Sequence, residues 1–476
     1  MSALRTPTSL TLLGFAACAA LTLGGCADRE QEHLGATLAT AQAVSTEAPL
    51  RAIKDTPFEQ LWDLRFPSPV WTCHQSSDVP ETLFFQLQSG ELAAVDALSG
   101  HTRWITAPLP ELLRLPPSAV RTRTPGIKPG EIVNTDRLYV VVRDELISYD
   151  VISGQVVWRY HLPFGASTGP MAIGPDANLR VYLGDWAGHL RVVTVHPEKR
   201  FPYVAWQWNL GASVVHQPVA AADLAYLADQ QGRVHCFRFD RDQAWEFNAG
   251  GAIHGAPAVR DQSLFVGGDD NILFALNRLT GEEQGRVVLN GAIKRQPLVF
   301  DNDPERVFVW VDSPEVGGLY AIRAQHGQVP TGDGQRPPRE VMRFAQEWYL
   351  PKAETLVAST PQYLYLTTST APHRVLAVNR ATGRVDWQVD LAAEQEAAPA
   401  YVAGYHDRTD QLRMMITADA DGRVVTYRFF GYVPAPDTAK PAAKPATSED
   451  APVDAKPGKA DKKAKEKDGK KDDKTL

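Results

Sequence analysis

The stretch Ala94-Val95-Asp96-Ala97-Leu98-Ser99-Gly100-His101-Thr102-Arg103-Trp104 decides the fold of this chain, because its spacing of Asp, Gly and Trp returns later. The aspartate can bond its own backbone two residues on, and the glycine completes that turn. The tryptophan adds a large area for burial. Two later copies keep all three landmarks at the same spacing, namely Asp150, Gly154 and Trp158, then Asn379, Gly383 and Trp387.

Weaker copies fill the rest of the chain. Asn277 and Gly281 keep the first half of the pattern, but Gly285 stands at the tryptophan position. A looser copy begins at Tyr320, and its Trp348 comes late, after a Pro/Gly-rich insertion. Three more copies end the same strand at Thr194, Arg238 and Arg428. The eight copies are about 47 residues apart on average, which is the length of four short strands.

Alternating strands joined by tight turns surround each copy, as in Leu138-Tyr139-Val140-Val141-Val142. This pattern predicts an all-β fold, a single β-propeller of four-stranded blades. We expect eight blades, with seven as the alternative if one weak copy is an insertion.

The two ends of the repeat region predict how the ring closes. Phe58 to Phe66, which contains Trp62, has a tryptophan strand but no preceding hairpin. Met414 to Phe430 has the hairpin but no tryptophan strand after it. The N-terminal strand therefore completes the last blade, and closure removes exposed sheet edges.

The N-terminus carries an export signal. Arg5 precedes an apolar run from Leu10 to Leu23, which leads into Leu23-Gly24-Gly25-Cys26. Residues 1–25 are therefore predicted to be a signal peptide. The last four residues resemble the bacterial lipobox, which implies cleavage before Cys26 and lipid on its thiol. An ordinary signal peptide is the alternative. Ala27 in place of an aspartate implies, by the same resemblance, the outer membrane and a periplasm-facing protein.

The remaining boundaries follow from composition. Residues 26–55 are expected to be a flexible tether, 56–433 the propeller, and 434–476 a Lys/Ala/Pro/Asp-rich tail too polar to fold. The net charge of -7 argues against nucleic acid as a partner, since that requires a basic face. Cys73 and Cys236 lie in the first and fourth copies, so a disulfide between them is not expected.

From about Thr56 to Val433 the chain resembles the PQQ-like (pyrroloquinoline-quinone-type) repeat family, and by layout the propeller lipoproteins that assist outer-membrane β-barrel assembly. The resemblance implies a non-catalytic scaffold that binds envelope proteins such as barrel-assembly components, as a monomer within a complex. Related quinoproteins hold the quinone and a calcium ion, and many have adjacent cysteines beside it. This chain has neither adjacent cysteines nor a C-x-x-C-H haem site, so no cofactor is expected.

Local motifs give little reason to expect catalysis or a metal. Gly165-Ala166-Ser167-Thr168-Gly169 matches the nucleophile-elbow pattern, which works only on a strand-turn-helix. Its place recurs in other copies with Ser213, Ile253 or Ile293, which indicates a blade-to-blade connector. Asp269-Asp270-Asn271 and Asp419 to Gly422 look like hairpin tips and lack a full calcium ladder.

The connectors also suggest a binding site, because all of them should meet at one rim of the central funnel. Structural residues would repeat from copy to copy, whereas the polar residues here vary. We therefore expect this rim to bind an extended peptide, a glycan or an anionic group, with plain solvated lining as the alternative. The candidate rim residues are Thr168, His216, Gln217, His254, Lys294 and Arg295.

Two other functions remain open from the sequence, a quinoprotein-like periplasmic enzyme and a ligand- or carbohydrate-sensing propeller. Two insertions are also unexplained. Pro110 to Pro129 could cover the funnel or contact a partner, and Gln328 to Arg343 is expected to be a mobile surface loop.

Overall fold

The computed structural model describes residues 35–37, 43–76, 78–109, 115–125, 132–174, 179–195, 201–239, 242–329, 339–368, 374–395, 399, 401–406 and 412–429. All of them belong to the first of two compact units, Met1–Tyr432. The predicted signal peptide, Cys26 and the predicted tail lie outside the described residues.

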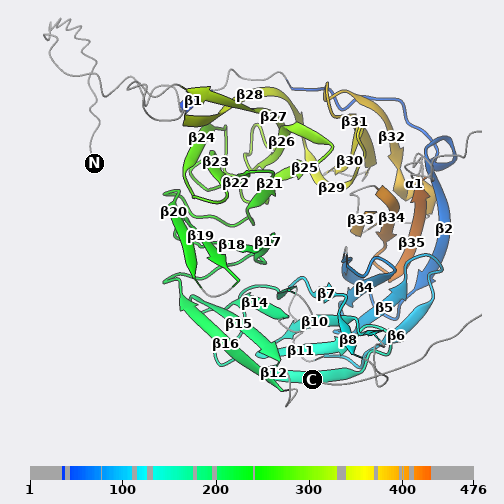
Figure 1. Ribbon diagram of the computed structural model, residues 1–476. Helices are drawn as coiled ribbons and strands as arrows, with labels where there is room; N and C mark the ends of the chain where they lie inside the picture. The colour runs from blue at the N-terminus through cyan, green and yellow to red at the C-terminus, as the bar shows by residue number, and fades with distance from the viewer. Residues whose placement is uncertain are drawn as a thin grey trace, which may run out of the picture. The chain divides into compact units, whose positions relative to one another are not determined.

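Within the described residues, eight antiparallel blades of four strands each follow one another around a ring, and one of the eight sheets has an additional fifth strand (Figure 1). The predicted eight-bladed propeller is therefore confirmed. Blade 1 consists of β3 (Val70–His74), β4 (Thr82–Leu87), β5 (Leu92–Asp96) and β6 (Thr102–Ile105), and blade 2 of β7 (Ser118–Val120), β10 (Arg137–Val142), β11 (Glu145–Asp150) and β12 (Val156–His161). Blade 3 consists of β13 (Met171–Ile173), β14 (Arg180–Gly184), β15 (His189–Val195) and β16 (Pro202–Asn209), and blade 4 of β17 (Val219–Ala221), β18 (Leu224–Ala228), β19 (Arg233–Arg238) and β20 (Gln243–Asn248).

The second half of the ring repeats this order, from the innermost strand of each blade to the outermost. Blade 5 consists of β21 (Ala258–Arg260), β22 (Ser263–Gly267), β23 (Ile272–Asn277) and β24 (Glu283–Val288), and blade 6 of β25 (Leu298–Phe300), β26 (Asp303–Val311), β27 (Gly318–Val329) and β28 (Arg339–Pro351). Blade 7 consists of β29 (Ala353–Ser359), β30 (Tyr363–Thr368), β31 (Arg374–Asn379) and β32 (Val385–Asp390), and blade 8 of β33 (Tyr401–His406), β34 (Leu412–Ala418), β35 (Arg423–Phe429) and β2 (Phe58–Arg65). The shorter elements are β1 (Gly35–Thr37), η1 (Ile53–Asp55), α1 (Leu391–Gln395) and the paired β8 (Arg123–Pro125) and β9 (Ile132–Asn134).

Ring closure follows the sequence prediction. β2 pairs antiparallel with β35, from Phe58 opposite Phe429 to Arg65 opposite Arg423. The first long strand of the described chain is thus the outermost strand of the last blade. Phe58 and Phe429 pack with ring centroids 5.4 Å apart, so the closure is also an apolar contact.

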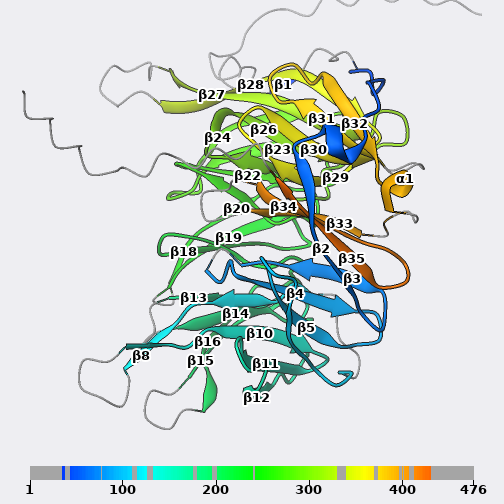
Figure 2. The same ribbon diagram turned by 90° about the vertical axis from the view of Figure 1, so that its right-hand side faces the viewer.

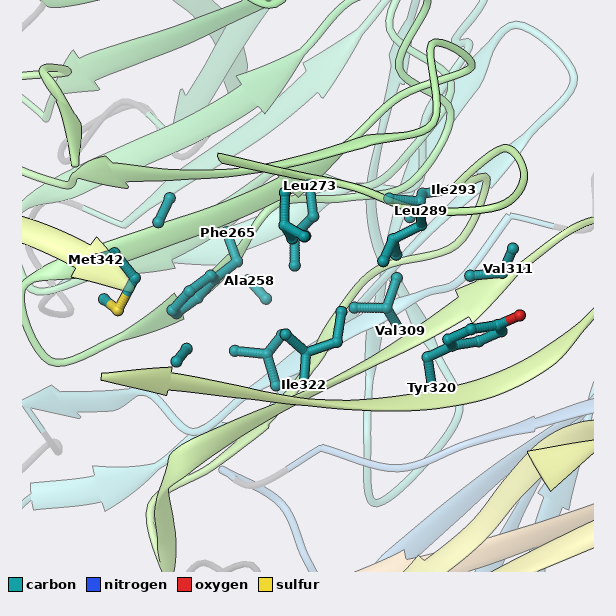
Figure 3. Packing of buried hydrophobic residues seen from close by; sticks show 14 residues of the cluster. Ala258, Phe265, Leu273, Leu289, Ile293, Val309, Val311, Tyr320, Ile322 and Met342 are labelled. Carbon is teal, nitrogen blue, oxygen red and sulfur yellow. The ribbon is translucent and has the colours of Figure 1, made fainter. Parts of the chain in front are cut away.

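The hydrophobic core lies between neighbouring blades. The middle strands are buried on both faces; all six residues of β4, for example, are buried. Figure 3 shows the core between blades 5 and 6, where Phe265 and Leu273 of one sheet meet Val309 and Ile322 of the next. Adjacent sheets thus supply the apolar area that stabilises each blade.

The repeated tryptophans join one blade to the next. The Trp104 ring lies over Gly154 of the following blade, where an added Cβ would be 2.6 Å from the ring. Gly154 has φ 68°, so glycine is needed for the turn as well as for the space. The indole N–H also donates a hydrogen bond to a backbone carbonyl of that turn. Four such bonds are present, from Trp62 to Ala97 (3.1 Å), Trp104 to Val151 (2.8 Å), Trp245 to Arg278 (3.1 Å) and Trp348 to Arg380 (3.0 Å).

The expectation of a mobile loop from Gln328 to Arg343 is wrong for its described part. β27 and β28 pair out to Val329 opposite Arg339, with one register shift between Ala321 and Ile322, and form a long hairpin (Figure 2). Trp348 lies opposite Ala321, as Trp104 lies opposite Ala94, so the late tryptophan is in register.

Part of the insertion from Pro110 to Pro129 belongs to a blade. Ser118–Val120 within it forms β7, the innermost strand of blade 2. Leu115 accepts a hydrogen bond at its carbonyl from the side chain of Gln86 in blade 1, at 3.2 Å. This segment therefore ties blades 1 and 2 together.

The described part of the predicted tether lies along the outer edges of three blades. β1 pairs in parallel with β24, Ala43 bridges to Tyr349 of β28, and Leu50 bridges to Gln388 of β32. We call residues 35–37 and 43–51 the strap. Among the described residues, no helix is long and apolar enough to cross a membrane.

Candidate functional site

The connectors between blades meet the hairpin tips of the blades that they enter. The amide of Asp269 donates to the carbonyl of Ala252, and that of Asp312 donates to Ala292. The packing is close, because a Cβ on Gly255 would collide with the backbone of Arg295 in the next connector. The connectors that enter blades 5 and 6 therefore contact each other and the hairpin tips of those blades.

Two of the predicted rim residues are buried. The Thr168 hydroxyl accepts a hydrogen bond from the amide of Gly184 at 2.8 Å and is fully buried. Ser167, the serine of the nucleophile-elbow pattern, is also buried in this connector. The backbone amide of Ser167 donates to the carbonyl of Gly184 at 2.9 Å, so the connector is held against blade 3, and neither side chain faces solvent.

His216 is 9% exposed, and its imidazole makes two backbone hydrogen bonds. Nε2 accepts from the amide of Ala228 at 3.0 Å, so Nδ1 carries the proton and donates to the carbonyl of Gln217, also at 3.0 Å. Burial lowers the pKa of His216, which keeps the ring neutral.

Gln217 also has a structural role. Its side-chain amide donates to the carbonyl of Pro170 in the previous connector. Gln296 repeats this contact two blades further on, where its side-chain amide donates to the carbonyl of Pro257 at 3.0 Å. A glutamine side chain thus links each of these two connectors to the connector before it.

The other three predicted residues do form an exposed cluster. His254 Nε2 lies 2.9 Å from Asp269, and Lys294 Nζ lies 2.9 Å from Asp312. We call His254, Asp269, Lys294, Arg295 and Asp312 the charged rim.

Arg295 crosses from blade 5 towards blade 7. Its guanidinium donates to the carbonyl of Glu354 and lies over the Trp310 ring, 5.2 Å from its centroid. The hydrogen bond to Asp312 and the negative charge of that carboxylate raise the pKa of Lys294. The charged rim thus presents paired basic and acidic side chains, which can orient a polar chain lying across them.

The sequence prediction missed a groove between blades 1 and 2, with a volume of about 610 Å³. One wall is Thr106 to Leu109, which follows the short strand β6, and the other includes Val142 to Glu145. Arg159 lines it and pairs with Glu145 at 2.8 Å.

The two cysteines that the structure describes are both free. Cys73 and Cys236 lie in β3 and β19, in different blades. Among the described residues, no group of three or more His, Cys, Asp and Glu side chains is placed to hold a metal ion.

Comparison with known proteins gives one family match. Residues 203–401 match the family model described as outer membrane protein assembly factor BamB. This segment runs from β16 to the start of β33 and contains the whole charged rim. No curated protein matches the chain in sequence.

Solved structures agree on the fold. BamB from Moraxella catarrhalis is 15% identical, covers 78% of this chain and all of its own (100%), and has a TM-score of 0.50. The WD40 domain of SCAP from fission yeast is 12% identical, covers 79% of this chain and 98% of its own, with a TM-score of 0.52. A quinohemoprotein alcohol dehydrogenase from Pseudomonas putida HK5 is 13% identical, covers 83% of this chain and 81% of its own, and has a TM-score of 0.48.

At these identities BamB and the WD40 domain, with TM-scores of 0.50 and 0.52, establish the fold alone. The chain is therefore an eight-bladed propeller, and residues 203–401 of it are similar to BamB.

Proposed function

We propose that this protein is a non-catalytic binding scaffold of the bacterial cell envelope, which acts in the assembly of outer-membrane proteins. The observation that carries the proposal is the match of residues 203–401 to the model described as an outer-membrane protein assembly factor. The proposal includes a lipid anchor at Cys26, a periplasm-facing location at the outer membrane, and no quinone or calcium.

The architecture suits such a role. Tryptophan side chains tie four of the blades to the blade that follows, which restrains the disc and the loops that it carries. A rigid surface loses little conformational entropy when a partner binds. The charged rim is the face that we propose for contact, because its side chains are exposed at fixed positions.

The test is a crosslinking pull-down of the lipidated protein from native membranes, with a version lacking residues 434–476 alongside. Recovery of β-barrel assembly components with both versions is expected. Recovery of only cell-wall material, or of nothing above an unrelated lipoprotein, would contradict the proposal and favour a ligand-binding or enzymatic role.

A further inference from the structure

The outermost strand of blade 3 differs from its counterparts in charge. β16 reads Pro-Tyr-Val-Ala-Trp-Gln-Trp-Asn and contains no charged residue. The other seven outermost strands that the structure describes each contain Asp, Glu or Arg. Charges on an edge strand normally prevent it from pairing with another chain, so β16 lacks the usual protection.

β16 also presents apolar surface to solvent. Tyr203 is 37% exposed and Trp208 is 39% exposed, and Ala205 between them is exposed as well. Trp208 is fixed by the Phe237 ring of blade 4, with centroids 5.8 Å apart, so its surface is presented in one orientation. Rigid aromatic surface of this kind is typical of protein-binding sites.

The chain itself shows what such an edge accepts. The strap adds extended segments to the outer edges of β24, β28 and β32. The amide of Val44 donates to the carbonyl of Tyr349 at 3.0 Å, and that of Arg51 donates to Gln388 at 2.9 Å. The described strap residues up to Leu50 are mostly small or apolar, and Glu47 is their one charge. Among the described residues, no strand pairs with the outer edge of β16.

We propose that the outer edge of β16 docks an extended, uncharged segment of a partner protein, by the same strand addition that the strap makes on blades 5 to 7. Main-chain hydrogen bonds supply the affinity in this mode, and the exposed side chains of β16 select an apolar segment. The inference rests on the proposed binding role and specifies the kind of segment bound. It does not depend on which assembly component supplies that segment.

The chain offers a matched pair of variants. Ala205 precedes Trp206 in β16, and Ala244 precedes Trp245 at the same place in β20, a strand that already contains Glu246. Ala205→Lys charges the proposed docking edge, and Ala244→Lys charges an edge that we do not expect to bind. Unchanged melting temperatures for both variants would show that each still folds.

The probe is a synthetic, fluorescent, end-capped peptide of about ten alternating Val and Thr residues, long enough for one strand. We expect saturable binding to the purified protein by anisotropy, at least about tenfold weaker with Ala205→Lys and within about twofold of wild type with Ala244→Lys, because only the first change charges the docking edge. Amide hydrogen exchange should slow within residues 203–209 of the complex.

No saturable binding, equal weakening by the two variants, or protection confined to another strand would overturn the proposal. A concentration-dependent dimer, seen by light scattering without peptide and lost in Ala205→Lys, would also overturn it, since a second copy would then be the occupant. These measurements use the protein alone, so their failure is distinct from failure of the membrane pull-down.

Discussion

The carbonyl of Met342 lies where a side chain on Gly285 would begin. Gly285 stands in the repeat where other blades have tryptophan, and it lies opposite Ala275 as Trp104 lies opposite Ala94. The extended hairpin of blade 6 thus fills the space that the missing indole would occupy in blade 5. The two departures from the repeat, a missing tryptophan and an insertion, compensate each other.

This relationship predicts that Gly285→Ala destabilises the protein by about 1–3 kcal/mol, because a methyl group there would push the hairpin away. Urea unfolding measures the change. Gly327→Ala, where a Cβ would have ordinary contacts at 3.5 Å, is the control and should change stability by less than about 0.5 kcal/mol. Equal effects at the two positions would show that Met342 and Gly285 are not tightly packed.

The indole hydrogen bonds should be measurable one at a time. Trp104→Phe leaves the carbonyl of Val151 without its donor, whereas the buried Nε1 of Trp206 has no hydrogen-bond partner among the described residues. We therefore expect Trp104→Phe to lower the free energy of unfolding by about 1–2 kcal/mol more than Trp206→Phe. Similar losses in the two variants would mean that apolar burial alone determines the cost.

His216 should make stability depend on pH. Its folded pKa is lowered by burial, and an unfolded histidine has a pKa of about 6.5. Below that pH the unfolded chain binds a proton that the folded one does not, so the contribution of His216 is complete above about pH 6.5 and decreases as the pH falls.

His216→Gln should therefore reduce the loss of stability between about pH 7 and pH 5 in urea unfolding, the range just below the unfolded pKa. Part of the loss should remain, because burial also lowers the pKa of His74 to about 4. An unchanged pH dependence would show that His216 does not titrate on unfolding.

Charge reversal tests the charged rim. The double variant Lys294→Glu and Arg295→Glu should fold with nearly the wild-type melting temperature, because exposed ion pairs contribute little to stability. It should recover at least about tenfold less assembly-component protein in the membrane pull-down, since like charges then face each other across the contact. Gln230→Glu, on the tip of a neighbouring blade, is the control. Full recovery with the double variant would remove the charged rim from the binding surface.

The strap should be released locally by a single change. The side-chain amide of Gln388 donates to the carbonyl of Ala48 at 2.7 Å. Gln388→Leu should speed exchange of the Arg51 amide by at least about tenfold without changing global stability, because only a local opening becomes easier. Gln207→Leu, at the equivalent place in β16, should leave that amide unchanged. Identical exchange in both variants would show that the side chain of Gln388 does not hold the strap.

The sequence predicted the ring well because its information is local and repeated. Trp62 had no hairpin before it and Arg428 had no tryptophan strand after it, and those two incomplete copies became one blade. The prediction for residues 328–343 failed because Pro and Gly dominated the composition there, while the alternation of the flanking strands was less obvious.

The rim was harder to predict, because polarity in a sequence does not tell whether a side chain faces water or a backbone group. Thr168 and His216 look as polar as Lys294, but each satisfies a buried amide of its own blade. Among the predicted rim residues, the long charged side chains of Lys294 and Arg295, which are costly to bury, are exposed, and His254 is half-buried.

Because β2 begins at Phe58 and its partner β35 ends at Phe429, the eighth blade depends on both ends of the repeat region. During synthesis the first strand must wait, with an open edge, until almost every other strand has been made. A chain cut short anywhere before β35 would therefore lack a closed ring, however well its finished blades had folded. Ring closure is therefore the last step in the folding of this propeller.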